Sequence, residues 1–234
     1  MNNFSNEKKY RHEQKYLCKQ GELINIENSI KSIMQKDIHA DNGGKYNIRS
    51  VYFDDYWDSC YFDNENGVNP REKFRIRIYN YSKELIKLEL KRKENGKTYK
   101  ESCLLDYDIC NRIIQAKKIP YIEGADPLYV KLYHAYETRR MIPKVIVEYE
   151  RKVYVYKYGN VRITFDEKIS SSEKIDQLFQ MQIAKRPIMP MGLCVLEVKY
   201  NEFLPDIIYR SLQKGYLRET TFSKYYYCRK FSLG

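Results

Sequence analysis

The segment Phe74-Arg75-Ile76-Arg77-Ile78 alternates strictly between apolar and basic residues. Residues two apart on a β-strand lie on the same face, so the two arginines share one face and the three apolar residues share the other. Strict alternation over a short run is typical of a half-buried strand. The segment therefore predicts a sheet with one apolar face and one face that carries guanidinium groups.

The same two-faced pattern recurs in Ile86–Lys91, Val161–Asp166 and Val195–Tyr200, where charged residues alternate with leucine, isoleucine, valine and phenylalanine. The turn Glu94-Asn95-Gly96-Lys97 is typical of a β-hairpin. We expect strands at Tyr10–Cys18, Tyr46–Asp54, Lys73–Tyr81, Glu84–Lys91, Thr98–Leu104, Lys144–Tyr156, Asn160–Asp166 and Leu193–Tyr200. These strands outnumber the predicted helices.

Helical periodicity lies between the strand groups. Helices are expected at Gly21–Gln35, from Asp106 through Lys118, from Asp126 to about Arg139, at Ser171–Gln180 and at Pro205–Lys214. Strands with helices between groups of them predict an α+β fold built on a large antiparallel sheet or barrel. No internal repeat and no linker-like stretch interrupts the chain, so we expect a single domain over residues 1–234.

The charged strand faces have two interpretations. In an ordinary sandwich they point to solvent. In a wide barrel covered by helices they converge in a polar lumen, and a lumen crowded with like charges needs anions. Arginine gives bidentate contacts and lysine gives a point charge, so the second arrangement suits a row of phosphates.

The composition narrows the class of protein. Lysine plus arginine is 42 and aspartate plus glutamate is 31, so the 234-residue chain has a net charge of +11. This balance points to polyanionic partners. The longest apolar runs are far too short to span a bilayer, and the first residues have no signal-peptide core, so we expect a cytoplasmic protein. No phosphate-binding loop, dinucleotide fingerprint or nucleophile elbow occurs.

Two carboxylates on the charged faces are candidates for a metal site. Glu197 lies two residues from Lys199, and Glu13 lies two residues from Lys15. Each carboxylate is either half of a salt bridge or a ligand of a divalent ion, because Mg²⁺ is usually held by one or two carboxylates and phosphate oxygens. Glu197 is the stronger candidate. His12, His39 and His134 form no local pattern, and only His12 is next to a charged strand.

An ordered series of motifs from about Tyr10 to Arg229 resembles the catalytic domain of the vacuolar transporter chaperone (VTC) polyphosphate polymerases, which belong to the triphosphate tunnel metalloenzyme, or CYTH-like, superfamily. The motifs are Arg11-His12-Glu13-Gln14-Lys15-Tyr16, Ile48-Arg49-Ser50-Val51-Tyr52-Phe53-Asp54, Arg75-Ile76-Arg77, Glu89-Leu90-Lys91 with Lys100, Val147-Glu148-Tyr149-Glu150-Arg151, Val161-Arg162-Ile163-Thr164-Phe165-Asp166, Glu197-Val198-Lys199 and Phe222-Ser223-Lys224-Tyr225.

The resemblance implies an antiparallel β-barrel that encloses a basic tunnel, with helices packed outside. It implies transfer of the γ-phosphate of ATP onto a polyphosphate chain, with release of ADP and with Mn²⁺ or Mg²⁺. The residues it assigns to the phosphates of ATP or product are Arg75, Arg77, Lys91, Lys100, Arg151 and Arg162. It places Lys15, Lys199, Ser223 and Lys224 along the tunnel, and it gives Glu197 to the metal.

The sequence departs from the family pattern in three places. Tunnel triphosphatases open with Glu-x-Glu-x-Lys, whereas Arg11 stands here in place of the first glutamate, which disfavours hydrolysis. The regulatory SPX domain and the transmembrane helices of the eukaryotic polymerases do not appear in the sequence. The segment Tyr136-Glu137-Thr138-Arg139-Arg140 offers a rival arginine for the family's Tyr-x-Arg motif, but Arg151 follows a strand, leads directly to Arg162 and is preferred.

Two alternatives stay open at this point. One is a tripolyphosphatase or nucleoside triphosphatase on the same fold, and the other is a non-catalytic module that binds polyanions. Nucleic acid is not the expected partner, because neither an RNA-binding aromatic motif nor a recognition helix is present. The sequence is compatible with a membrane partner for the product, and it does not determine the oligomeric state.

Overall fold

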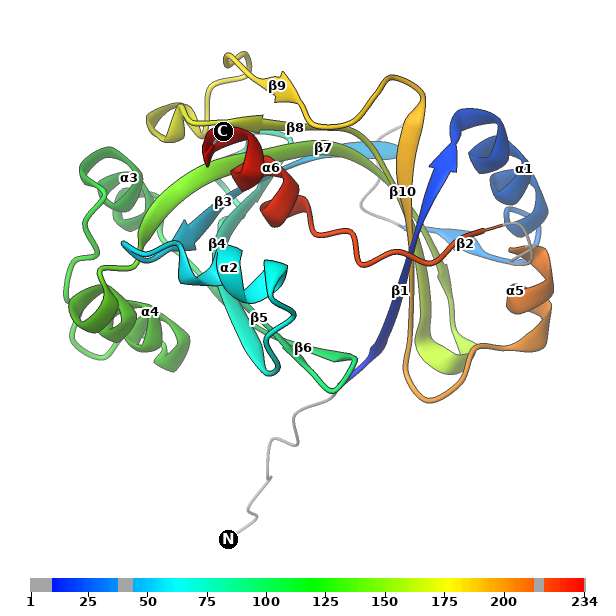
Figure 1. Ribbon diagram of the computed structural model, residues 1–234, viewed down its shortest axis with the longest axis horizontal. Coiled ribbons are helices and arrows are strands. Elements are labelled where there is room, and N and C mark those ends of the chain that lie inside the picture. The colour runs from blue at the N-terminus through cyan, green and yellow to red at the C-terminus, as the bar shows by residue number, and fades with distance from the viewer. Residues whose placement is uncertain (1–9, 38–43, 213–216, 234) are drawn as a thin grey trace, which may run out of the picture.

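The computed structural model describes residues 10–37, 44–212 and 217–233. Their strands form one antiparallel sheet that curls into a half-barrel (Figure 1). The main path through the sheet is β1 (His12–Lys19), β10 (Leu193–Tyr200), β8 (Val161–Ser172), β7 (Ile142–Tyr156), β3 (Lys45–Asp54), β4 (Arg71–Tyr79), β5 (Lys87–Glu94) and β6 (Lys97–Leu104). The short strands β2 (Gln35–Lys36) and β9 (Arg186–Pro187) pair with β7 and β8.

The curl brings the two edges of the sheet together at one end. The amide of Arg11, just before β1, donates to the carbonyl of Thr98 in β6 at 3.0 Å, and the amide of Thr98 donates back at 3.0 Å. This bridge joins the first and last strands of the path, so the charged strand faces turn toward one another. The predicted α+β fold, an antiparallel barrel with helices outside, is confirmed.

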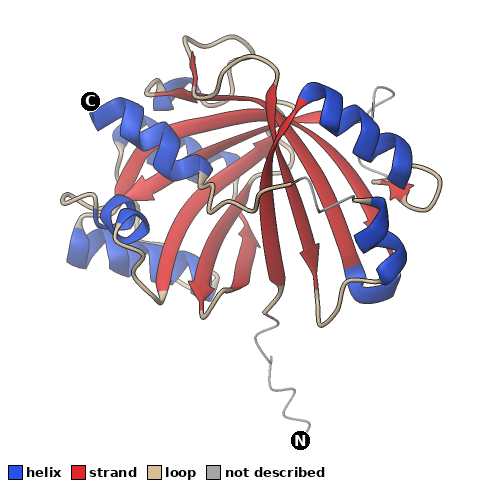
Figure 2. Cartoon of the chain, turned by 45° about the vertical axis from the view of Figure 1, so that its right-hand side comes forward, coloured by secondary structure: helices blue, strands red, loops and turns tan. Residues whose placement is uncertain are grey.

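The helices stand in two groups around the sheet (Figure 2). One group is α1 (Gln20–Ile30) and α5 (Asp206–Ser211). The other comprises α2 (Ser59–Glu65), α3 (Tyr107–Ala116), α4 (Pro127–Arg139) and α6 (Lys224–Leu233). Two short 3₁₀ helices lie at Tyr158–Asn160 and Ile175–Gln177. No helix in the described part of the chain is long and apolar enough to cross a bilayer.

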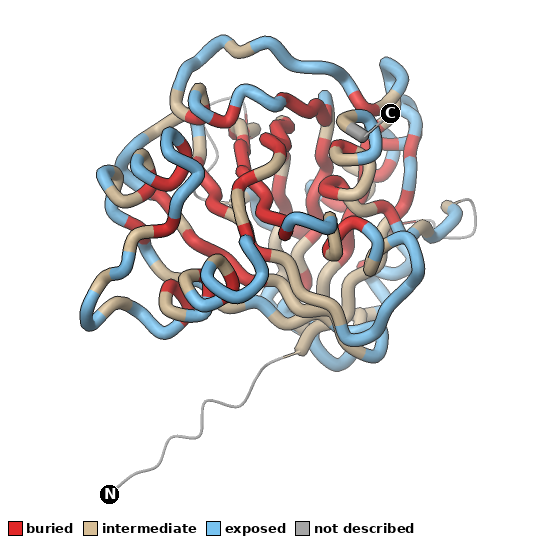
Figure 3. Tube along the Cα trace, turned by 60° about the vertical axis from the view of Figure 1, so that its left-hand side comes forward, coloured by how far each residue is buried: buried red, intermediate tan, exposed pale blue. Residues whose placement is uncertain are grey.

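The apolar strand faces pack under these helices. Ile76 and Ile78 of β4 are fully buried in the larger core, and Leu196 and Val198 of β10 are fully buried in a smaller core with α1. Exposed residues gather in the loops and on the outer helix faces (Figure 3). Burial of the convex face leaves the concave face for the charged residues.

Local sequence explains most element boundaries. The Asp106 carboxylate accepts hydrogen bonds from two amides at the start of α3, and Asp126 caps α4 ahead of Pro127. The predicted hairpin turn joins β5 to β6, with Asn95 and Gly96 both at positive φ, as a type I′ turn requires.

One predicted helix is wrong, and two helices were missed. Residues 171 and 172 extend β8, and only a 3₁₀ turn follows, because the strand keeps its pairing with β7 and the Ser172 hydroxyl accepts from the amide of Lys174. Neither α2 nor α6 was expected. Helix α6 gave a weak signal because it is rich in tyrosine, a weak helix former. The end of the helix predicted at Pro205–Lys214 lies outside the described residues.

A buried ion pair on the convex face holds the segment after β8. The guanidinium of Arg49 is fully buried and lies 2.5 Å from the Glu148 carboxylate. It also donates to the carbonyls of Leu178 at 2.8 Å and Gln180 at 2.5 Å. Since removing one member of a buried pair leaves the other charge without compensation, this contact is expected to matter for stability.

We therefore predict that Glu148→Ala lowers the free energy of unfolding by about 3–5 kcal/mol. The matched control is Glu150→Ala on the same face of β7, because its partner Lys168 is largely exposed and such a pair contributes about 0–1 kcal/mol. Urea denaturation measures both values. Equal losses in the two variants would contradict the role assigned to the buried pair.

Candidate functional site

Strand register places the basic residues of β4 and β5 on the concave face. Arg75 lies opposite Glu89, and Lys73 lies opposite Lys91. Alternation then puts Arg71, Lys73, Arg75 and Arg77 on one face. The concave face therefore carries a row of four cations along β4 alone.

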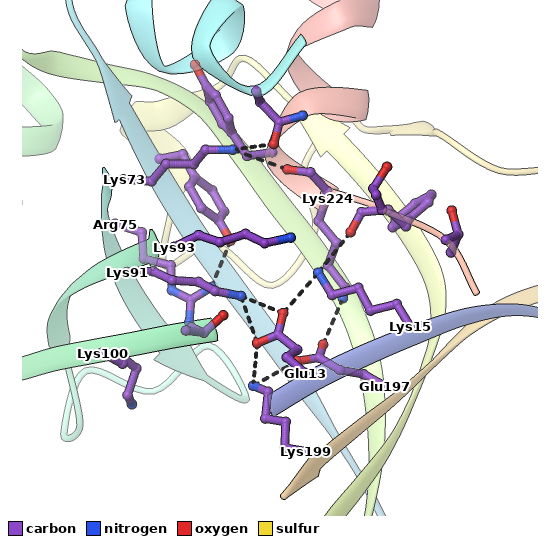
Figure 4. Close-up of a pocket in the computed structure, with 18 of the residues that line it drawn as sticks. Glu13, Lys15, Lys73, Arg75, Lys91, Lys93, Lys100, Glu197, Lys199 and Lys224 are labelled. Atoms are coloured by element: carbon purple, nitrogen blue, oxygen red, sulfur yellow. Dashed lines mark hydrogen bonds and ion pairs between the residues drawn. The ribbon is translucent and has the colours of Figure 1, made fainter. Parts of the chain in front are cut away.

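These residues surround a cavity of about 200 Å³, here called the central cavity (Figure 4). Eleven lysines and arginines and three carboxylates line it. The basic residues are Lys15, Arg71, Lys73, Arg75, Arg77, Lys91, Lys93, Lys100, Arg151, Lys199 and Lys224. The carboxylates are Glu13, Glu197 and Glu219. The charge balance favours a ligand with several negative charges.

The structure brings together ten of the eleven residues that the sequence singled out. Those in the lining are Lys15, Arg75, Arg77, Lys91, Lys100, Arg151, Glu197, Lys199, Ser223 and Lys224. They come from β1, β4, β5, β6, β7, β10 and the segment that leads into α6. Their assigned roles in phosphate and metal binding remain predictions.

Arg162 is the exception. It shares the concave face of β8 with Thr164 and Asp166, but it does not line the central cavity. Its guanidinium donates to the Asp37 carboxylate at 3.1 Å and to the Tyr46 hydroxyl at 3.2 Å. Alternation placed Arg162 on the correct face, but alternation carries no information about depth along the lumen.

Sequence reasoning missed several lining residues, among them Arg71, Lys73, Lys93, Tyr52 and Tyr149. For the basic residues, the sequence did contain a pattern that could have identified them. The alternation in β4 and β5 extends past the quoted motifs and places these side chains on the same faces. The tyrosines carried no such signal, because tyrosine in a strand is as often a core residue.

Glu89 fixes the positions of three cations of the central cavity. Its buried carboxylate accepts from Arg75 Nε at 2.7 Å and from Lys100 Nζ at 2.8 Å, and Arg77 Nη1 lies 3.6 Å away. Burial raises the pKa of Glu89, but the two arginines and Lys100 outweigh it and hold the pKa far below its usual range. Glu89 therefore stays ionised and orients the groups around it.

Asp166 performs the same task on the opposite wall. This fully buried carboxylate forms a bidentate pair with Arg151 at 2.6 and 2.7 Å, and Lys224 Nζ lies 2.6 Å away. Burial raises the pKa of Asp166, whereas Arg151 and Lys224 lower it, and the net shift is downward. The cations from β7 and α6 are thereby held before any ligand arrives.

Glu13 and Glu197 are the candidate metal ligands. They lie on adjacent strands, with Glu13 opposite Lys199 and Glu197 opposite Lys15. Lys199 Nζ is 2.8 Å from Glu197 and 3.7 Å from Glu13. Lys91 Nζ is 2.6 Å from Glu13, and Figure 4 shows these side chains converging. Both expectations for these carboxylates, a salt bridge and a metal ligand, are compatible with this geometry.

Both carboxylates are ionised. Burial and the neighbouring Glu197 raise the pKa of Glu13, but Lys91, Lys15 and Lys199 bring it well below its usual range. Burial also raises the pKa of Glu197, and Lys199, Lys15 and Lys224 more than offset this effect. A pair of ionised carboxylates with little exposed surface, beside a row of basic groups, fits Mg²⁺ or Mn²⁺, which bind one or two carboxylates and complete their shell with other oxygens such as those of phosphate and water.

A family model described as the VTC domain matches residues 10–232 of this sequence. The chain belongs to the VTC domain family. This confirms the family predicted from the motif series. A search of the curated proteins finds no match to this VTC domain.

Solved structures that are similar to this chain are distant from it in sequence. The PH1819 protein of Pyrococcus horikoshii is 13% identical, with 95% of this chain and 99% of that chain covered at a TM-score of 0.50. A putative adenylate cyclase of Bacillus halodurans is 12% identical, with 88% and 87% covered at 0.50. The Mimivirus capping enzyme triphosphatase is 13% identical, with 91% and 90% covered at 0.40. At these identities the first two comparisons establish the fold of the VTC domain and nothing more.

The segment before α6 forms part of the cavity wall in this VTC domain. The amide of Thr220 donates to the carbonyl of Lys15 at 2.8 Å, and Lys15 Nζ donates to the carbonyl of Phe222 at 2.8 Å. Beyond it, the Tyr225 hydroxyl donates to Asp54 at the end of β3. These contacts join the C-terminal motif to β1 and β3, so Ser223 and Lys224 face the central cavity.

Burial and neighbouring positive charges shift the pKa of Lys73 in the central cavity. Burial lowers the pKa of Lys73 to about 7, with Arg71 and Lys15 acting in the same direction. The Lys73 amino group is held by Asn64 at 3.0 Å and Ser223 at 3.3 Å. A polyanion in the cavity favours the charged form of such a lysine, so binding above neutral pH is coupled to proton uptake.

We predict that tripolyphosphate binding at pH 8 takes up protons, since a lysine with a pKa of about 7 is mostly neutral at that pH and becomes charged beside the ligand. Calorimetric titrations in buffers of different ionisation enthalpy measure the uptake. Lys73→Met removes part of it. The control is Lys87→Met, because Lys87 lies outside the cavity lining, over the ring of Tyr79. A binding enthalpy that is the same in every buffer would refute the coupling.

Proposed function

We propose that this VTC domain is an ATP-dependent polyphosphate polymerase. It transfers the γ-phosphate of ATP onto the end of a polyphosphate chain and releases ADP. The observation that carries the proposal is the central cavity, in which eleven basic residues lie around Glu13 and Glu197, whose side chains are only 7% and 5% exposed. Membership of the VTC domain family supports the same assignment.

Positioning and charge neutralisation account for most of the catalysis of phosphoryl transfer. A terminal phosphate oxygen of the chain attacks the γ-phosphorus, and the bond from that phosphorus to the β–γ bridging oxygen breaks. The electron pair of the broken bond leaves with ADP. Arg75, Arg77 and Arg151 are fixed by buried carboxylates or tyrosine hydroxyls, so they offer prearranged donors for the phosphates.

Glu13 and Glu197 would hold the divalent ion. When bound, Mg²⁺ or Mn²⁺ supplies a positive charge that offsets charge on phosphate oxygens. Lys199 and Lys91 pair with these carboxylates and would be available to contact phosphate if the carboxylates held the ion. The ion pairs hold both carboxylates ionised and in place.

The reaction requires no strong general base, because the attacking phosphate is already anionic at neutral pH. The structure is consistent with this. His12, the histidine nearest the charged strands, stacks on Tyr200 with ring centroids 5.0 Å apart, and neither residue lines the central cavity. Hydrolysis, by contrast, would require the protein to order a water molecule as the nucleophile. Arg11 stands where the tunnel triphosphatases have their first glutamate, so one carboxylate that could help to order such a water is missing, and this favours polymerisation over hydrolysis.

A product assay tests the proposal. We expect ATP and Mn²⁺, with a short polyphosphate primer, to give a ladder of long chains on a gel together with a matching amount of ADP. Free phosphate without a ladder would assign the protein to the phosphohydrolases. Neither product, with salt-sensitive binding of polyphosphate, would indicate a module that holds phosphate chains without making them.

Variants of the central cavity test the assigned roles. Arg75→Gln and Glu197→Gln are each expected to reduce the rate of ADP formation by roughly 10²–10³, by analogy with the loss of one prearranged donor at an oxyanion site. Arg140→Gln is the control, because this exposed residue after α4 lies outside the cavity. Full activity in a folded Glu197→Gln protein would remove this residue from the metal site.

A further inference from the structure

A second cavity of about 250 Å³ lies on the other side of β4. Glu72 and Phe74 contribute to it, and they alternate with the residues that face the central cavity. Helix α2 and the end of α4 supply other walls, including Arg139. The second cavity is therefore separated from the central cavity by the sheet itself.

The lining of the second cavity is also basic. Arg71, Arg92 and Arg139 contribute three guanidinium groups, against the carboxylates of Asp63 and Glu72. Glu72 is already neutralised, because Arg92 lies 3.2 Å and Lys131 lies 3.1 Å from the same oxygen. Asp63 is thus the remaining lining carboxylate against Arg71 and Arg139. This balance suits an anion.

Arg71 lines both cavities. It is the first residue of β4, at one end of that strand. Its register partner in β5 is Lys93, which lies in the central cavity. Arg71 Nη1 donates to the carbonyl of Val68 at 2.8 Å, which holds the guanidinium at this rim. The basic linings of the two cavities therefore meet at Arg71, and Arg139 belongs to the lining of the second cavity.

The central cavity, at about 200 Å³, cannot contain a long polyphosphate. Resting on the function proposed above, we infer that the second cavity is an extended binding site for the part of a polyphosphate chain that has left the central cavity past Arg71. Arg139 contacts that part of the chain. Because Arg139 is exposed at the end of α4 and touches no group assigned to phosphoryl transfer, it acts on binding of the chain and on no step of the reaction.

The test compares two probes on the full chain by calorimetry at one fixed salt concentration: tripolyphosphate and long-chain sodium polyphosphate. Arg139→Gln is expected to weaken binding of the long chain about tenfold, which is the effect of losing one charge-assisted hydrogen bond, and to leave tripolyphosphate within twofold of the parent. Arg139→Lys should retain most of the long-chain affinity, since it keeps the charge.

The matched control is Arg140→Gln, the next residue, which is exposed and lines neither cavity. Equal weakening of the long chain by Arg139→Gln and Arg140→Gln would overturn the inference, because the effect would then be one of net charge. Unchanged long-chain binding in Arg139→Gln would overturn it as well. If Arg139→Gln weakened the binding of tripolyphosphate and of the long chain equally, the inference would also be overturned. Such a result would indicate an independent site for short phosphates or for other small phosphorylated molecules.

The binding test separates this inference from the proposed function. It uses no ATP and needs no turnover. If the product assay gives no ladder while Arg139→Gln still discriminates between the two probes, the polymerase assignment fails and the extended site stands. If the ladder forms and Arg139→Gln binds both probes like the parent, the extended site fails and the polymerase assignment stands.

Discussion

The concave face of the sheet is governed by a constraint of charge. Cations crowd the concave face of the sheet, and such a face is stable without a ligand only if buried anions hold the cations in place. Glu89 and Asp166 do this from opposite walls, and each is buried beneath the groups it binds. Because both carboxylates stay ionised, the guanidinium and ammonium groups keep fixed positions and still present an excess of positive charge to the cavity.

This arrangement explains why the two faces of each strand differ so strongly. The convex face packs fully buried isoleucine, leucine and valine under the helices, which supplies the hydrophobic stabilisation. The concave face buries charge, which contributes little to stability and is costly unless paired. Stability and ligand binding are thus assigned to opposite sides of the same strands, and a shift of register by one residue would exchange them.

Much of this could be predicted from alternation and motif order. The strands and the face that Arg75 shares with Arg77 follow from a period of two, and the hairpin at Asn95-Gly96 follows from its turn residues. The stretch around Ser171 was misassigned because its strand pairing depends on residues far away in the chain. Helix α6 was missed because its tyrosines are weak helix formers and its position depends on packing against β7 and α2.

The sequence by itself determined which side chains share a face, since that depends only on neighbours two residues apart. It also determined the family, because the motifs occur in a fixed order along the chain. Only the tertiary structure decided which charges meet. Arg162 carries the same alternation as Arg75, yet it pairs with Asp37 away from the central cavity, whereas Arg71 reaches two cavities. Contacts between residues far apart in the chain, such as the bridge between Arg11 and Thr98 that joins the two edges of the sheet, leave no local pattern.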